Sequence, residues 1–178
     1  MSLIILIAQG LPDLFYYERT KLAQGELWRL VTGHFTHNNT AHLLLNLTGF
    51  WLWIVLQPPT LRIQRLMSLS ILVAGLMSGL FWFTLPKLGW YLGFSGVLYS
   101  LFGAWAGYLL YTRDYLLGVL LAATLIGKTL WDAIHPDSIS QQLIGAPVVY
   151  HAHIYGLLLS PLSALCLYRR SSPAPHKA

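Results

Sequence analysis

The chain has 178 residues, of which 56% are hydrophobic and only 10% are charged, and its mean hydropathy is +0.57. This composition leaves little room for a water-soluble domain and indicates an integral membrane protein embedded in a lipid bilayer. The formal net charge of +5 is not gathered into a basic cluster, which argues against nucleic acid as a partner. The single cysteine excludes an internal disulfide framework.

Six apolar runs are long enough to predict membrane-spanning helices, although several are near the lower limit of about 17 residues. In chain order they cover residues 1–17, 41–56, 66–85, 91–111, 115–131 and 144–168. The first run lacks a basic n-region and a small-residue cleavage site, so we expect a retained helix and not a secretory signal. A start upstream of Met1 stays open as the alternative.

The predicted fold class is therefore an all-α membrane protein with six transmembrane helices. We expect one domain over residues 1–170, followed by a short cytoplasmic tail over residues 171–178. The charge pattern favours a cytoplasmic N-terminus, because Lys and Arg concentrate on the cytoplasmic side of membrane proteins. With that orientation, the inner loops and tail carry six basic residues against one acidic residue, and the outer loops carry five of each.

Two polar residues with complementary chemistry lie at membrane depth. Ser95 is at the outer start of the fourth predicted helix, and His153 is in the outer part of the sixth. A polar side chain in hydrocarbon costs free energy, so an ionisable residue there is a functional-site hypothesis. Serine and histidine are the residue types of a nucleophile and its base. The sequence therefore predicts a catalytic pair.

Small residues recur along both helices and would allow the close packing that this pair needs. One stripe contains Gly96, Ser100, Gly103 and Gly107, and the other contains Ala152, Gly156, Ser160 and Ala164. Such stripes fit plain helix packing equally well. They are more specific evidence together, because the two helices that carry them also carry Ser95 and His153.

The surroundings of the histidine predict a dyad. Tyr99 is one turn beyond the serine on the same helix face, where its ring could brace the imidazole. We expect no carboxylate beside His153, because Asp114 is at the cytoplasmic end of its helix and Asp132 and Asp137 fall in an outer loop. The sequence therefore predicts a Ser/His dyad without a third member.

Two further polar residues could stabilise the oxyanion that forms in acyl transfer. His42 and Asn46 lie one turn apart at the outer start of the second helix, so their side chains share a face. Together with the backbone N–H of Ser95 they could donate hydrogen bonds to the oxyanion. The alternative is that they only join helices by hydrogen bonds, which is common in membranes.

The segment of residues 18–40 is the longest outer segment, and its mixture of aromatic and polar residues suits a structure at the membrane interface. Within it, Trp28 and Arg29 could tie the segment to lipid headgroups or to backbone carbonyls. An ordinary interfacial anchor is the alternative.

Together these motifs resemble the rhomboid family of intramembrane serine proteases. The match runs in the family's order through Trp28-Arg29, His42-x-x-x-Asn46, Gly93-x-Ser95-Gly96 with Tyr99, and Ala152-His153-x-x-Gly156. The resemblance implies the six-helix rhomboid fold, a Ser95 nucleophile, His153 as general base and acid, and an oxyanion site of His42, Asn46 and the Ser95 amide. It also implies a transmembrane helix of another protein as substrate, with no cofactor or metal. Ser160 departs from the family, which usually repeats glycine there.

Within that family the chain looks most similar to the rhombosortases. The supporting stretches are Leu11-Pro12-Asp13, Trp28-Arg29-Leu30 through Thr32-Gly33-His34, and Ala146-Pro147-Val148-Val149. This resemblance implies a multi-pass enzyme of the bacterial inner membrane, with its active site toward the periplasm. Its substrates would be exported proteins with a C-terminal Gly-Gly, an apolar helix and a basic tail.

Two other classes of protein remain as alternatives. One is a catalytically inactive rhomboid-like chaperone or binding protein, against which the intact serine and histidine argue. The other is a metal or haem protein built on membrane histidines. Its candidate ligands are His34, His37, His42, His151 and His153. Their spacing is not the H-E-x-x-H signature of a zinc site.

Overall fold

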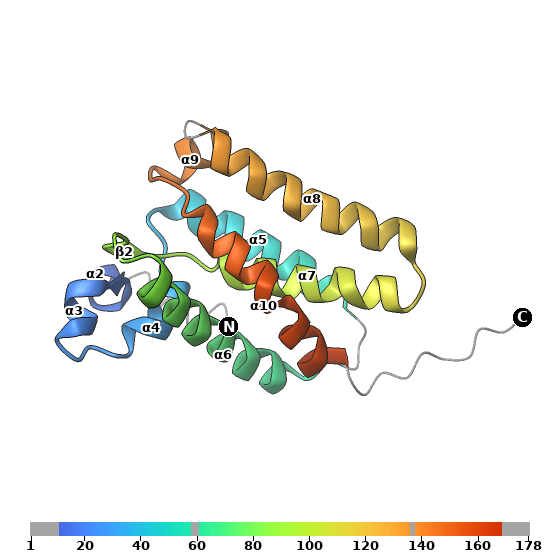
Figure 1. Ribbon diagram of the computed structural model, residues 1–178, viewed down its shortest axis with the longest axis horizontal. Coiled ribbons are helices and arrows are strands. Elements are labelled where there is room, and N and C mark those ends of the chain that lie inside the picture. Colours follow the sequence, from blue (N-terminus) through green and yellow to red (C-terminus); the bar gives the residue numbers. More distant parts are fainter. Residues whose placement is uncertain (1–10, 58–60, 136–137, 169–178) are drawn as a thin grey trace, which may run out of the picture.

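The computed structural model describes residues 11–57, 61–135 and 138–168, which form a mostly helical protein (Figure 1). The long helices are α5 (Thr40–Val55), α6 (Ile63–Thr84), α7 (Ser95–Tyr111), α8 (Tyr115–Ile134) and α10 (Tyr150–Tyr168). The short ones are α2 (Pro12–Phe15), α3 (Arg19–Ala23), α4 (Arg29–Thr32), the 3-10 turn η1 (Gly33–Phe35) and α9 (Ile139–Ile144). Strands β1 (Tyr17–Glu18) and β2 (Trp90–Tyr91) pair antiparallel.

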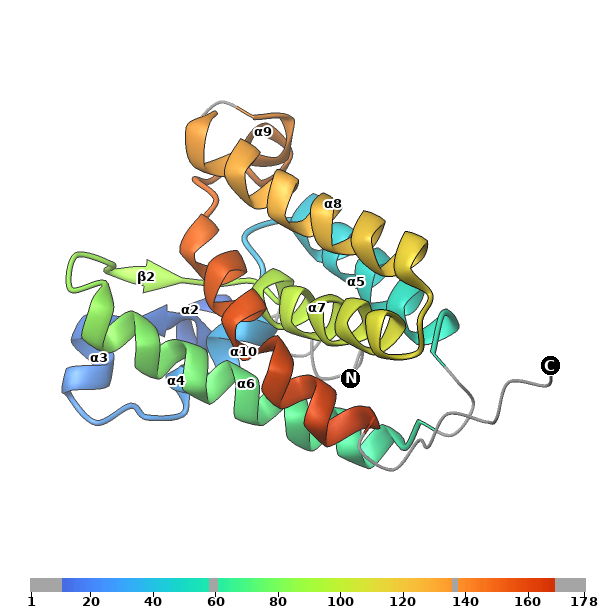
Figure 2. The ribbon, with the colours of Figure 1, turned by 45° about the vertical axis from the view of Figure 1, so that its right-hand side comes forward.

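Helix α7 is the centre of the arrangement, because α5, α6, α8 and α10 all pack against it. In both ribbon views α7 and α10 cross in the middle, with α6 on one side and α5 and α8 on the other (Figures 1 and 2). The short helices α2 to α4 lie together beside one end of α6. Helix α7 thus carries its first residue, Ser95, into the middle of the bundle.

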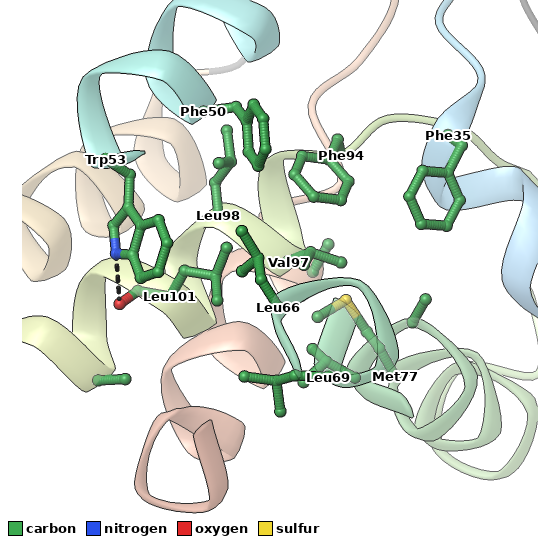
Figure 3. Packing of buried hydrophobic residues seen from close by; sticks show 14 of the residues in the cluster. Phe35, Phe50, Trp53, Leu66, Leu69, Met77, Phe94, Val97, Leu98 and Leu101 are labelled. Carbon is green, nitrogen blue, oxygen red and sulfur yellow. Dashed lines mark hydrogen bonds between the residues drawn. The ribbon is translucent and has the colours of Figure 1, made fainter. Parts of the chain in front are cut away.

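A buried apolar cluster holds α5, α6 and α7 together (Figure 3). Phe50 and Trp53 of α5 pack with Met77 of α6 and Leu101 of α7, all fully or almost fully buried. The Trp53 indole N–H donates a hydrogen bond to the Leu101 carbonyl over 3.0 Å, which satisfies its polar atom in an apolar core. The cluster fixes the helix that begins with Ser95.

The outer helix faces are apolar as well. Large hydrophobic side chains are more than half exposed along α8, for example Leu116 (75%), Leu120 (55%) and Leu130 (59%). An exposed apolar surface of this kind suits contact with lipid. Among the described residues, α6 and α8 are long and apolar enough to cross a membrane, and α5 is apolar but shorter. Length and composition therefore identify fewer spans than the six predicted from the sequence.

Several predicted helix boundaries are wrong for identifiable reasons. The first predicted helix does not reach Tyr17, because Tyr17 pairs with Tyr91 in the small sheet. The same pairing delays the start of the fourth helix to Ser95. The sixth helix begins at Tyr150 and not at residue 144, because α9 ends in a left-handed Gly145 and an irregular stretch follows. Residues 1–10 of the first prediction and the predicted tail, 171–178, lie outside the described residues.

Helix α10 continues through a proline, and the serine before it accounts for this. Pro161 has no N–H to donate to the carbonyl of Leu157, four residues earlier. The Ser160 hydroxyl donates to that same carbonyl over 2.7 Å. Ser160 therefore satisfies a backbone group that the proline leaves without its helical partner.

The segment around Trp28 and Arg29 is tied to backbone carbonyls, one of the two options predicted for it. The Arg29 guanidinium donates to the carbonyls of Tyr16 (2.8 Å) and Asp13 (3.0 Å), and the Trp28 indole donates to that of Leu14 (3.1 Å). A second arginine, which the sequence did not single out, does the same elsewhere. Arg19 donates to the Trp82 carbonyl over 2.7 Å and so caps the C-terminal end of α6.

Candidate active site

The helices α7 and α10 meet with almost no side chain between them. A Cβ atom at Gly156 would collide with the backbone carbonyl of Gly96, and one at Gly96 would lie 3.0 Å from the backbone carbonyl of Ala152. Further along, the hydroxyls of Ser100 and Ser163 share a hydrogen bond of 2.8 Å. The small-residue stripes therefore form the contact for most of their length. Gly107 is the exception, with nothing within 4 Å of a Cβ placed on it.

This close contact brings the predicted serine and histidine together. Ser95 Oγ lies 3.1 Å from His153 Nε2, which is hydrogen-bond distance. Tyr99 stacks on the imidazole, with ring centroids 4.1 Å apart and planes 5° from parallel. His153 is 6% exposed, so its ring is held between α7 and the residues that face it.

The residues predicted for the oxyanion site gather around a glycine with an unusual backbone. Gly93 has φ +124°, a conformation that other residues rarely adopt, and a Cβ there would lie 2.7 Å from the His42 ring. His42 and Asn46 are both buried, at 6% and 5% exposure, and Asn46 Nδ2 has no hydrogen-bond partner. An unpaired buried donor costs free energy unless a ligand accepts from it. The structure thus places a free donor near Ser95.

The first turn of α5 positions these two side chains. Asn39 caps the helix by accepting a hydrogen bond of 2.8 Å from the His42 backbone N–H. Its amide also donates to the carbonyls of Leu143 (3.0 Å) and Ile144 (2.8 Å), at the end of α9. One asparagine thereby fixes both the helix that carries His42 and the segment that leads into α10.

A cavity of about 330 Å³ opens onto the serine and the histidine. Its walls come from α5, α7, α8, the stretch after α9 and the start of α10, and most of them are apolar. A second cavity of about 610 Å³ is lined by α8, α9 and Leu45 of α5, and it shares Leu45, Lys128 and Ser140 with the first. The two cavities therefore adjoin on the side of the bundle that α5, α8 and α9 form.

The expectation that no carboxylate lies near His153 is wrong. Asp132 is in helix α8, which extends to Ile134, and its Oδ2 lies 3.7 Å from His153 Nδ1. The helix predicted from hydropathy ends at residue 131, which places Asp132 in a loop. The signal that could have found it is Lys128-x-x-x-Asp132, since an oppositely charged pair at this spacing stabilises a helix.

Of the candidate histidine ligands of a metal, His37 and His42 lie edge to face, with ring centroids 4.9 Å apart. Over the described ranges, no group of three His, Cys, Asp or Glu side chains could hold a metal ion. His34 has a different partner, since its Nε2 lies 3.0 Å from the Ser78 hydroxyl. Burial lowers the pKa of His34 to about 3, so this ring is neutral inside the fold.

Comparison with known proteins identifies the family of the chain. Residues 24–170, well over half of the chain, match the family model described as the Rhomboid domain. A comparison with curated proteins gives no match. The matched range includes Ser95, His153, His42 and Asn46. The chain thus belongs to the rhomboid family of membrane proteins, whose members are typically intramembrane serine proteases that act on transmembrane substrates.

Proposed function

We propose that the protein is an intramembrane serine endopeptidase that uses Ser95 as nucleophile and His153 as general base and acid. The observation that carries the proposal is the 3.1 Å distance between Ser95 Oγ and His153 Nε2, in a chain of a family of intramembrane proteases. A serine hydroxyl is a weak nucleophile, and a histidine at this distance activates it by accepting its proton.

The proposed reaction follows from the atoms around this pair. Ser95 Oγ attacks a peptide carbonyl carbon while its proton passes to His153 Nε2. The oxyanion forms beside Asn46 Nδ2, the His42 ring and the backbone N–H of Ser95, which has no acceptor within the helix because Ser95 is the first residue of α7. His153 then protonates the leaving amine. A water molecule hydrolyses the acyl-enzyme by the same steps and releases the serine.

We propose that the substrate helix approaches between α5 and α8. Two cavities support this route, because Leu45 of α5 and Lys128 of α8 line both of them and Ser95 lines the first. An apolar passage suits a helix that leaves lipid. A peptide bond in a regular helix is already hydrogen-bonded, so the substrate must unwind near Ser95 before attack.

The finer assignment that we propose is a rhombosortase with six transmembrane helices in the bacterial inner membrane. The active site would face the periplasm, and the substrates would be exported proteins ending in Gly-Gly, an apolar helix and a basic tail. The support is the set of sequence stretches that resemble this subgroup. One of them, Ala146 to Val149, also lines the cavity at the serine. Glycines before an apolar helix would help the chain unwind.

The test is cleavage of two membrane-anchored reporters by purified protein in liposomes. One carries a C-terminal Gly-Gly, an apolar helix and a basic tail, and the other carries a transmembrane helix without this signal. Wild type is compared with Ser95→Ala, His153→Ala and the control Ser68→Ala, which changes an exposed serine on α6. We expect a loss of at least about 10³-fold for the first two variants and none for the control.

The outcomes separate the proposals. Cleavage of both reporters alike would retain the protease and remove the rhombosortase assignment. Product from Ser95→Ala at the wild-type rate would contradict the mechanism. Tight binding of the reporters without cleavage by wild type would favour the inactive chaperone instead.

A further inference from the structure

The second ring nitrogen of His153 is buried and faces a carboxylate. His153 Nδ1 is exposed by less than 1 Å² and has no hydrogen-bond partner. Among the described residues it faces the carboxylate of Asp132, whose Oδ2 is 3.7 Å away and whose side chain is 0% exposed. A buried ring N–H without an acceptor costs about 1–3 kcal/mol. A shift of less than about 1 Å would bring this pair to hydrogen-bond distance.

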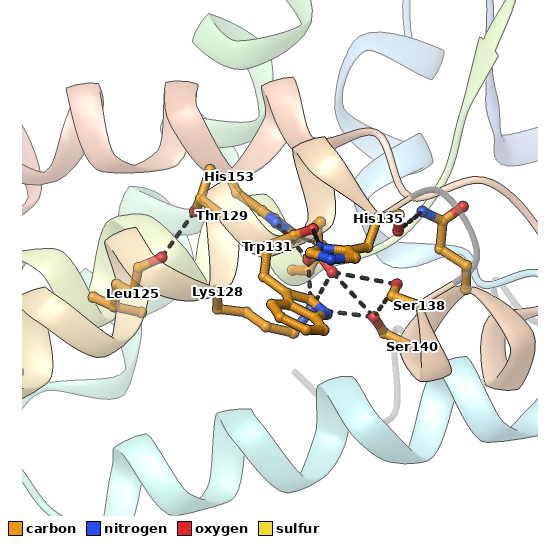
Figure 4. Close-up of polar contacts among 11 residues, drawn as sticks. Leu125, Lys128, Thr129, Trp131, His135, Ser138, Ser140 and His153 are labelled. Atoms are coloured by element: carbon orange, nitrogen blue, oxygen red, sulfur yellow. Dashed lines mark hydrogen bonds and ion pairs between the residues drawn. The ribbon is translucent and has the colours of Figure 1, made fainter.

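The carboxylate is held in place by three side chains from α8 and the start of α9. Lys128 forms an ion pair with Asp132 from one helical turn earlier. The Ser140 hydroxyl donates to Asp132 Oδ1 over 3.1 Å, and the Ser138 hydroxyl lies 3.5 Å from the same oxygen. Figure 4 shows Lys128, Ser138, Ser140 and His153 converging on one point beside α8. The serines contact Oδ1, whereas Lys128 contacts both carboxylate oxygens, so Oδ2 faces the imidazole and the ammonium group together.

We propose that Asp132 is a positioning residue for His153, so that the site works as a Ser95–His153–Asp132 triad. Lys128 partly neutralises the carboxylate of this triad. In this arrangement His153 Nδ1–H donates to Asp132 Oδ2. That contact selects the tautomer whose Nε2 can accept the proton of Ser95. The inference rests on the proposed protease function and adds a residue to it.

The charges around His153 explain why both members of the ion pair matter. When Ser95 attacks, the imidazole becomes a cation, and a carboxylate within about 4–6 Å stabilises that cation. The positive Lys128 opposes this effect, so it limits how far Asp132 can stabilise the charge. The other groups that face the ring are Tyr99 and Ser95 of α7 and His42 of α5. Asp132 is thus the acidic group that acts directly on the imidazole.

The test is the pH profile of kcat/KM for reporter cleavage, measured with Asp132→Asn and Lys128→Gln. For Asp132→Asn we expect kcat to fall about 10- to 100-fold with little change in KM, because only the charged state of the histidine loses stabilisation. Since the histidine must be neutral to accept the proton, the acid limb should move to lower pH by about one unit. For Lys128→Gln the acid limb should move to higher pH, because the carboxylate is no longer neutralised.

Each control variant makes the same substitution at an exposed residue of the same type, away from the site. Asp114→Asn changes the exposed aspartate at the other end of α8, and Lys87→Gln changes an exposed lysine far along the chain from the site. Neither should move the acid limb. If Asp132→Asn does not fold because Lys128 is left unpaired, the double variant Lys128→Gln with Asp132→Asn restores charge balance and should show the same lowered kcat.

Opposite shifts for the two variants would support the triad, since a purely structural role for the ion pair would not move the acid limb in two directions. Wild-type kcat and an unchanged pH profile in Asp132→Asn would overturn the inference and leave the Ser/His protease intact. Absence of cleavage by wild type would overturn the proposed function itself. The two failures are therefore distinguishable.

Discussion

The contact between α7 and α10 and the gap between α5 and α8 are built in opposite ways. Along α7 and α10 the backbones touch, with Gly96 against Gly156 and Ser100 bonded to Ser163. Between α5 and α8 there are cavities, and large apolar side chains such as Leu45 (48% exposed) point outward. At Gly96, Gly103 and Gly156 the first contact has no room for a methyl group, whereas the cavities leave room for a ligand.

The difference follows from what each region must do. Ser95 and His153 come from different helices, and a hydrogen bond between them tolerates errors of only a few tenths of an ångström. The rigid seam of α7 and α10 supplies that precision. A substrate helix, however, must reach the serine from the lipid, so the helices on the other side cannot be packed as tightly. We infer that one side of the fold fixes the geometry of Ser95 and His153, and that the other side admits the substrate helix.

The largest effect is expected where the seam has least room. Gly156→Val places two methyl groups against the Gly96 carbonyl, a backbone atom that cannot move without shifting α7. We expect destabilisation of about 3 kcal/mol or more and loss of cleavage, at the upper end of overpacking costs. Thermal unfolding in detergent and reporter cleavage measure both. The matched control is Gly107→Val, since a Cβ there has nothing within 4 Å. Equal destabilisation of the two variants would contradict the seam as described.

The next effect lies in the oxyanion site. Gly93→Ala drives a methyl group into the His42 ring and forces alanine into φ +124°. Gly25→Ala is the matched control, because Gly25 has φ +97° but open space around its Cβ position. Backbone strain should cost both variants about 1–2 kcal/mol. Only Gly93→Ala should also lower kcat, by about 10²-fold, as expected for the loss of an oxyanion donor. A similar kcat in both variants would mean that His42 does not act on the oxyanion.

A smaller effect is expected from the stacked ring on His153. Tyr99→Leu removes the aromatic stack, which is worth about 0.5–1.5 kcal/mol, so kcat should fall about 2- to 12-fold as the imidazole loses its fixed orientation. Tyr99→Phe keeps the ring and should retain near-wild-type kcat. A large loss in Tyr99→Phe would instead assign the role to the tyrosine hydroxyl.

The seam was predictable from the sequence, and the carboxylate beside His153 was not. Glycine and serine at every third or fourth position predict helix contact by themselves, and that pattern is enough to put Ser95 and His153 on facing helices. The same reasoning missed Asp132. Its position depends on where α8 ends, and helix ends are set by caps and tertiary contacts that hydropathy does not record.

The irregular segments were hidden for a related reason. Tyr17 and Tyr91 pair although they are 74 positions apart in the sequence, and a strand of two residues has no local pattern that would predict it. Gly93 was identified only as part of a motif. Glycine is required there because a side chain would collide with the His42 ring, and this contact is known only from the structure. The sequence therefore predicted which residues matter better than it predicted the backbone that connects them.

The smallest effect is expected at the cavities between α5 and α8. Leu45 and Leu44 are neighbours on α5, both about half exposed, but only Leu45 lines the two cavities. Leu45→Ala should widen the passage and raise kcat/KM for a transmembrane reporter a few-fold, with little change in thermal stability. Leu44→Ala removes the same side chain from the lipid-facing side and should change neither. If cleavage rises equally in both variants, general loosening of α5 is the cause. A rise in Leu45→Ala alone, absent for a short soluble peptide that needs no lateral route, would locate substrate access between α5 and α8.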